Sequence, residues 1–217
     1  TWAIDHGYRP DDKPNPCKRL KRFRENPRER YLTASEIERL MVVLDDLDTR
    51  AAESPHITAA IRLLLLTGAR LSEIITLKWD YVDLETATLW LPDSKTGKKT
   101  IRLNSQAVAL LTDLPRLDGN PYVIAGHRTG AHLVNLQKPW RRIRALAGLA
   151  DVRIHDLRHS FARIAINAGA SLAMVGKLHG HSQPQTTARY ARLADDPLRQ
   201  LNKQIGAAIS GKPKTTS

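Results

Sequence analysis

A chain of 217 residues, 41% of them hydrophobic, is long enough for one sizeable packed domain with an extension. Its single cysteine, Cys17, excludes an internal disulfide framework, and its longest apolar run, 57–66, is shorter than the ~20 residues that span a bilayer. With 34 lysines and arginines against 22 acidic residues, the formal charge of +12 favours a nucleic acid as partner; a generally basic surface is the alternative.

The first thirty residues differ from the rest of the chain. They hold several prolines and a run of closely spaced cations: Lys18, Arg19, Lys21, Arg22 and Arg24. We interpret residues 1–30 as an extended linker or arm that lies along phosphate, with a disordered tail as the alternative. The polar start of the chain is unlike a signal peptide.

A folded unit is expected to begin near Tyr31. The spacing of Thr33 and Glu36 is that of a capping box, which predicts the first helix. Helical periodicity and turn residues predict helices over 34–48, 56–66, 71–77, 105–114, 135–149, 155–168, 171–178, 184–191 and 196–209. Two strands, over 86–91 and 99–103, are predicted around a basic turn. The pattern is mainly α with a small antiparallel β-sheet (α+β), followed by a loose tail over 210–217.

Four segments hold polar side chains in apolar surroundings. In the first, Gly68 permits a sharp reversal after a buried helix, and Arg70 follows at the start of the next one. The helix dipole gives a cation no help there, so Arg70 is expected to serve more than local stability. Glu73, one turn on, is placed to orient Arg70 through a bidentate pair; a purely structural pair is the alternative.

The second segment is the basic loop between the predicted strands, which contains Lys95. A lysine at a hairpin tip is usually only solvated, and that remains the alternative to a functional role. In the third segment, His155 and Arg158 are three residues apart and therefore project from one side of a helix start. A polar pair beside the apolar stripe of Leu157 and Phe161 indicates a site.

The fourth segment runs from His181 to Tyr190. Gly180 and Pro184 bracket a turn into a short predicted helix that carries Tyr190. Of the five tyrosines, Tyr190 lies nearest in sequence to a cluster of histidine and arginine.

The histidines are poor candidates for a metal site. His155 and His159 have the i, i+4 spacing of zinc helices, but no glutamate follows His155, and Arg158 would repel a cation. We therefore predict no metal.

Together, these segments resemble the tyrosine recombinases, the family of phage integrases and chromosome-dimer resolvases. The matching pieces stand in the family's order: Thr67 to Glu73, the Lys95 hairpin, His155 to His159, Gly180 to Ser182, and Tyr190 nine residues after His181. The resemblance implies the tyrosine recombinase catalytic-domain fold over 31–209. The family's separate N-terminal core-binding domain is longer than residues 1–30, so we expect a catalytic fragment that keeps the interdomain linker.

The resemblance also implies a mechanism that uses no cofactor. Tyr190 attacks a DNA phosphodiester and leaves a 3′-phosphotyrosyl bond, which conserves the energy of the phosphodiester, and a free 5′-hydroxyl. Arg70 and Arg158 clamp the negative non-bridging oxygens, with Glu73 in support.

The remaining implied roles concern protons. Lys95 is the implied general acid for the leaving 5′-oxygen. His155 accepts the Tyr190 proton or hydrogen-bonds a phosphate oxygen, and His181 donates a hydrogen bond to the phosphate.

Binding of double-stranded DNA is expected to be wide and mostly electrostatic. Besides the basic arm, candidate phosphate contacts are Lys98, Lys99, Arg141, Arg142, Arg144 and Arg153. The helix that Lys138 opens is expected to lie near a groove of the DNA, and an exposed amphipathic helix is an equal alternative. We expect a cytoplasmic protein that self-associates on DNA, as a tetrameric synapse, and has no membrane partner. The helix over 196–209 docks either on a neighbouring protomer or on its own domain.

Two other functions stay open. A type IB topoisomerase uses similar chemistry but returns the original strand; it usually carries lysine where this chain has His155. A non-catalytic DNA-binding module is the other alternative, and it has no need of a tyrosine beside a phosphate clamp.

Overall fold

The computed structural model describes residues 2–12, 30–94 and 97–179. Its helices are α1 (Trp2–Asp5), α2 (Ala34–Thr49), α3 (Pro55–Thr67), α4 (Leu71–Ile75), α5 (Ser105–Asp113), α6 (Gln137–Leu146), α7 (Ile154–Asn167) and α8 (Leu172–His179). Its strands are β1 (Val82–Asp83), β2 (Thr88–Ser94) and β3 (Gly97–Arg102), preceded by the 3₁₀ turn η2 (Trp79–Tyr81). The predicted fold class, mainly α with a small antiparallel sheet, is confirmed. Within the described ranges no helix is both long and apolar enough to cross a membrane.

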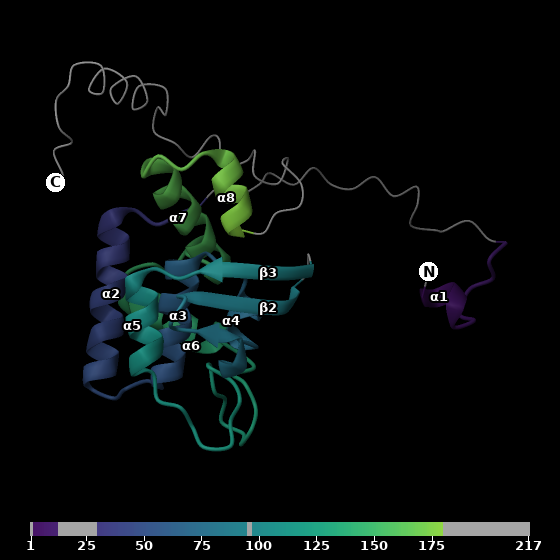
Figure 1. Cartoon of the computed structure of the whole chain (residues 1–217), viewed down its shortest axis with the longest axis horizontal. Helices are drawn as coiled ribbons and strands as arrows, with labels where there is room; N and C mark the ends of the chain where they lie inside the picture. Colours follow the sequence, from purple (N-terminus) through teal and green to yellow (C-terminus); the bar gives the residue numbers. More distant parts are fainter. Residues whose placement is uncertain (1, 13–29, 95–96, 180–217) are drawn as a thin grey trace, which may run out of the picture.

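Helix α3 forms the centre of the fold. It contacts α2, α4, α5 and α7, and α2, α3 and α5 stand together at one side of the sheet (Figure 1). Most of its side chains are buried, including Ile61, Leu63 and Leu64. Pro55 occupies its first turn, where the missing N–H costs nothing, and Gly68 ends it in a left-handed conformation with φ of 61°. The helix predicted over 56–66 is therefore confirmed.

Helix α2 begins at the predicted capping box. The Glu36 backbone N–H donates to Thr33 Oγ1 at 3.3 Å, and the Thr33 N–H donates to Glu36 Oε2 at 2.8 Å. Leu40 and Leu44 are fully buried one turn apart on its inner face. On its outer side, Arg39 Nε donates to the carbonyl of Ala147 at 3.2 Å, which ties α2 to the end of α6.

The sheet has strand order β1-β2-β3, with both pairs antiparallel. Leu89 pairs with Ile101, and Leu91 with Lys99, so alternate residues of the two long strands face the core. Trp90, between the two leucines, is 52% exposed on the other face. The hairpin was predicted; the two-residue β1 was not, because so short a strand leaves no alternation to detect.

Three element predictions need correction. Helix α6 begins at Gln137 rather than 135, because the Asn135 side chain accepts the Gln137 N–H at 2.9 Å and forms a turn instead. It ends before Gly148, whose φ of 68° is left-handed. Residues 2–12 are not wholly extended: Trp2 stacks on His6 across one helical turn, with ring centroids 4.5 Å apart. The predicted helices over 184–191 and 196–209 lie outside the described residues.

Candidate active site

The corner between α3 and α4 is fixed against α7. The guanidinium of Arg158 donates to the Gly68 carbonyl, across 90 positions of sequence. A Cβ on Gly68 would lie 2.4 Å from the ring of Phe161, one turn further along α7. Glycine therefore permits both the turn and the close approach, and Arg70, two residues later, is held beside the helix that carries Arg158.

Arg70 stands at the N-cap of α4, where Glu73 folds back onto it. Arg70 Nη1 donates to Glu73 Oε1 at 2.8 Å, and the Arg70 backbone N–H donates to Glu73 Oε2 at 2.8 Å. The Glu73 side chain is only 4% exposed. The predicted pairing of the two residues is present, but the guanidinium uses one nitrogen rather than the expected two, because the second carboxylate oxygen accepts from the Arg70 backbone N–H and from Lys99 Nζ.

Lys99 completes this group from the sheet. Its Nζ lies 2.9 Å from Glu73 Oε2, and its side chain is 5% exposed. We expected Lys99 to contact DNA phosphate; in the structure its side chain is instead buried against Glu73, because the strand's alternation turns Lys99 inward, in phase with the buried Ile101. That alternation was the sequence signal that could have placed it.

Burial and charge act against each other in this group. Burial by itself raises the pKa of Glu73, but the Arg70 backbone N–H and the Lys99 charge outweigh it and hold that pKa below its usual value. Burial lowers the pKa of the Lys99 amine; Glu73 opposes the effect, and the charges of Arg158 and Arg70 add to it. The charges of both arginines thus act on one amine, and two of the three cations, Arg70 and Lys99, pair directly with the Glu73 carboxylate.

The start of α7 adds the second predicted pair. Asp156 Oδ2 accepts the Arg153 N–H at 2.8 Å. The acidic side chain at the third helical position therefore caps the backbone N–H before the helix, as Glu73 does for Arg70 at the start of α4. His155 is exposed, and its ring meets that of His159 edge-on at 4.7 Å between centroids. Arg158 is 4% exposed.

A pocket of about 230 Å³ opens at this helix start. His155 and Arg158 both line it, as predicted from their spacing, together with Leu64, Ala69, Leu71, Gln137 and Ile154. The N-terminus of a helix favours anions, because its free N–H groups and dipole are positive. A concave site with a buried guanidinium, an imidazole and a helix N-terminus suits a phosphate. Among the described residues, no group of three or more metal-ligating side chains is gathered.

Three of the six predicted catalytic residues lie outside the described residues: Lys95, His181 and Tyr190. The cations Lys18, Arg19, Lys21, Arg22 and Arg24 of the predicted arm also lie there. The structure brings together Arg70, Arg158 and their support, and it sets His155 on the same pocket as Arg158.

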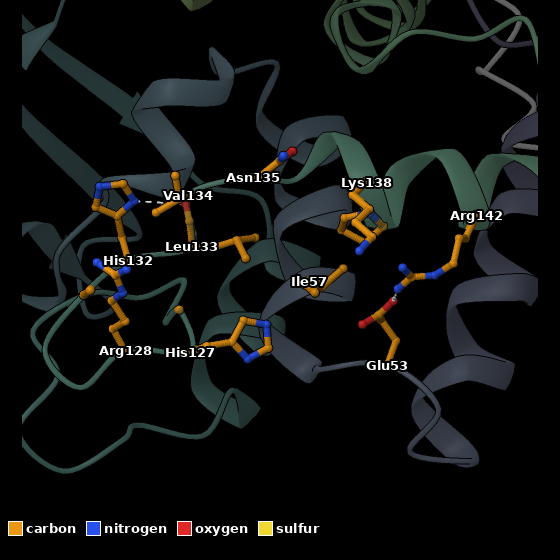
Figure 2. A pocket seen from close by; sticks show the side chains of 13 residues that line it. Glu53, Ile57, His127, Arg128, His132, Leu133, Val134, Asn135, Lys138 and Arg142 are labelled. Atoms are coloured by element: carbon orange, nitrogen blue, oxygen red, sulfur yellow. Dashed lines mark hydrogen bonds and ion pairs between the residues drawn. The ribbon is translucent and has the colours of Figure 1, made fainter.

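A second, larger pocket of about 730 Å³ lies between α6 and the loop before it (Figure 2). Lys138 and Arg142 project from α6, while His127, Arg128 and His132 come from the loop (Figure 2). Glu53 is its one acidic side chain and pairs with Arg142. The pocket is therefore strongly cationic.

The other predicted phosphate contacts have varied surroundings. Lys98, Arg141 and Arg153 are exposed, and Arg142 is exposed but paired with an acidic side chain. Arg144 is partly buried, and its Nη1 donates to the Val152 carbonyl at 2.6 Å. Arg144 therefore ties the segment between α6 and α7 to α6.

Comparison with known proteins agrees with this geometry. The model of the phage integrase family matches residues 30–196. The chain belongs to the phage integrase family. Tyrosine recombinase XerD of Pseudomonas putida is 26% identical to it over 94% of this chain and 78% of XerD. Against five other curated relatives, the chain spans 35–53% of the relative's length.

Solved structures share the fold of this phage integrase family member. The catalytic domain of bacteriophage HP1 integrase superposes with a TM-score of 0.59 at 23% identity, over 80% of this chain and 93% of that domain. XerH site-specific recombinase, in a pre-cleavage complex with its difH substrate, gives a TM-score of 0.62 at 22% identity, over 74% of this chain and 49% of XerH.

Proposed function

We propose that this chain cleaves and rejoins double-stranded DNA as the catalytic part of a site-specific recombinase. The observation that carries the proposal is the contact of Arg158 with the Gly68 carbonyl, because it holds the turn that leads to Arg70 against the helix whose Arg158 and His155 line one pocket of about 230 Å³. Family membership supports it, as do the XerD relative, named a tyrosine recombinase, and the XerH structure, named a complex with difH.

In the proposed reaction, the Tyr190 oxygen forms a bond to phosphorus while the bond from phosphorus to the 5′-oxygen breaks. Arg70 and Arg158 neutralise charge that gathers on the non-bridging oxygens, where planar guanidiniums fit. The tyrosine proton passes to His155, and Lys95 donates a proton to the leaving 5′-oxygen.

His181 completes the proposed set with a hydrogen bond to the phosphate. The 3′-phosphotyrosyl bond is then attacked by the 5′-hydroxyl of a partner strand, which releases Tyr190. Two such rounds exchange both strands. We propose that the exchange takes place in a tetramer assembled on DNA, in the cytoplasm, where the DNA of prokaryotes and their phages lies.

We further propose that the 730 Å³ cationic pocket receives the DNA backbone away from the cleavage point. In Figure 2, His127, Arg128 and His132 lie on one side of it and Lys138 and Arg142 on the other, so phosphate oxygens seated there would meet donors from both sides. These contacts fix the position of the duplex and carry no sequence information.

The decisive experiment traps the covalent intermediate. Duplexes carrying candidate recombination sites and a nick beside the cleavage point lose the 5′-hydroxyl fragment, so an adduct accumulates. Tyr190→Phe should abolish the adduct and leave DNA affinity nearly intact, and Arg158→Ala should slow its formation by about 10²-fold or more. An adduct of undiminished yield from Tyr190→Phe would remove Tyr190 as nucleophile.

The topoisomerase alternative is tested separately. Supercoiled plasmid without a recombination site should persist when incubated with the chain, because cleavage requires the specific site. Efficient relaxation of that plasmid would favour a type IB topoisomerase over a recombinase.

A further inference from the structure

We propose that Lys99 is a positioning residue for strand cleavage: it holds the Glu73 carboxylate so that Arg70 presents a free edge of its guanidinium to the scissile phosphate. The inference rests on the proposed function, since it assigns Arg70 to the phosphate. It gives Lys99 a role inside the protein rather than on DNA.

The three side chains form a line from the interior to the surface. Lys99 Nζ and Glu73 Oε2 are 2.9 Å apart, and Glu73 Oε1 and Arg70 Nη1 are 2.8 Å apart. The exposed fractions of the side chains rise from 5% for Lys99 and 4% for Glu73 to 22% for Arg70. Arg70 is thus the member that meets solvent, and the other two support it from behind.

Lys99 changes how Arg70 can bind Glu73. An arginine beside a lone carboxylate tends to form two parallel hydrogen bonds, which would use one whole edge of the guanidinium. Here Oε2 already accepts from Lys99 Nζ and from the Arg70 backbone N–H, so the guanidinium engages Oε1 alone through Nη1. Within the described part of the chain, its remaining nitrogens make no hydrogen bond to protein. Those nitrogens match the bidentate geometry of a phosphate.

Stability alone gives little reason for a lysine at this position. Lys99 pairs across the sheet with the buried Leu91 and lies in phase with the buried Ile101, a setting that an apolar side chain would fill. Burying an ammonium group is costly, and buried ion pairs often add nothing over well-packed apolar residues. The effect of the Lys99 charge on the Glu73 carboxylate explains why a lysine rather than an apolar residue stands at this position.

The same arrangement gives the site a net positive charge. Arg70 and Lys99 both pair with the single carboxylate of Glu73, and the charge of Arg158 acts on the Lys99 amine, so these four side chains together carry an excess of two positive charges. Without Lys99, Glu73 would neutralise a larger share of the charge of Arg70 and pull its second nitrogen inward. A dianionic transition state would then meet a weaker and poorly aimed clamp.

The test compares Lys99→Met with Lys99→Arg and with Arg102→Met. Arg102 lies three residues along the same strand and is exposed, so its variant removes one positive charge without touching Glu73. Adduct formation on the nicked duplex is measured at saturating DNA, together with the Kd. Lys99→Met should cleave about tenfold or more slowly with Kd changed by less than about threefold, since positioning acts on the transition state.

Lys99→Arg should recover most of the cleavage rate, because it restores the charge and the donors, and Arg102→Met should cleave like the unaltered chain. If Lys99→Met instead weakens DNA binding while cleavage at saturation is unchanged, Lys99 is a phosphate contact and the proposal is wrong.

A substrate with a methyl group in place of one non-bridging oxygen separates positioning from general damage. The methyl group removes one of the two negative charges of the transition state, so Arg70 has less charge to neutralise and the deficits of Lys99→Met and Arg70→Ala should both shrink. A deficit of Lys99→Met that stays the same on this substrate would mean a merely structural role. Should Lys99→Met fail to fold, as judged by thermal melting, adduct formation and Kd are measured for Glu73→Gln instead.

Arg70→Ala also separates the proposed clamping role of Arg70 from the proposed positioning role of Lys99. If Arg70→Ala cleaves normally, the proposed clamp itself fails. If Arg70→Ala is impaired on the ordinary substrate but Lys99→Met is not, only the positioning role fails.

Discussion

Gly68 combines two demands that no other residue meets at low cost. Its φ of 61° lies in the left-handed region, and a Cβ there would overlap the Phe161 ring. The residue determines where Arg70 stands relative to α7, although it takes no part in chemistry. Its effect on function is therefore steric.

Gly68→Ala should destabilise the fold by about 1–3 kcal/mol, from backbone strain together with the displaced ring, and should slow cleavage as well. Gly148→Ala is the matched control, because Gly148 has a similar φ of 68° but nothing within 4 Å of the added Cβ. Urea unfolding of the two variants isolates the contribution of Phe161. Equal losses from both variants would contradict the close-approach argument.

Residue patterns revealed part of this site. The i, i+3 spacings of Arg70 with Glu73 and of His155 with Arg158 are local, so the sequence was sufficient to pair them. Lys99 reaches Glu73 across 26 positions, from a strand to a helix, and such a contact is set by the fold. The two adjacent lysines at 98 and 99 look alike in the sequence, and only the direction of the strand's alternation separates them.

At the scale of elements, helix starts organise the molecule. The capping box of α2 was predicted because threonine and glutamate have a known spacing there. The starts of α4 and α7 use the same acidic third position but an arginine before the helix, which is no capping signal by itself. The end of α6 was misjudged because buried Leu149 continues the apolar pattern past Gly148. Periodicity marks burial, and a helix can end before its burial pattern does.

The start of α2 also carries an acid-sensitive ion pair. The hydrogen bond from Arg30 lowers the pKa of Glu36 from 4.5 to about 2. A carboxyl whose pKa is lower in the folded state adds stability above its ordinary pKa, and this is lost as the pH falls from about 4.5 towards 2. Arg30 also bonds Asp151 at 2.9 Å, which joins α2 to the segment before α7.

Glu36→Gln should therefore lower the free energy of unfolding by about 1 kcal/mol at neutral pH, with a gap to the unaltered chain that narrows below about pH 4.5. Urea titrations at several pH values measure it. Asp46→Asn is the control, because its ion pair with Arg50 is largely exposed and should contribute little at any pH. A gap that stays constant on acidification would contradict the role assigned to the Glu36 charge.

At the scale of the whole molecule, the formal charge of +12 is divided between different tasks. Some cations are structural: Arg62 bonds Asp45 and Asp48, and Arg144 bonds a carbonyl. Others, around the 730 Å³ pocket, have little acidic compensation. Composition predicted a polyanion as partner, but only the fold separates the cations that are already engaged from those that face outward.

That division makes DNA affinity a test of which cations meet phosphate. Each phosphate contact releases counterions, so log Kd should rise steeply with log salt concentration, and Arg128→Ala or Lys138→Ala should each reduce that slope by about 1. Arg50→Ala is the control, because Arg50 is equally cationic but pairs with Asp46 on α2 and does not line the pocket. An unchanged slope for both pocket variants would place the duplex elsewhere. A loss of slope in Arg50→Ala as large as theirs would mean that affinity follows net charge alone, without a defined path for the backbone across this pocket.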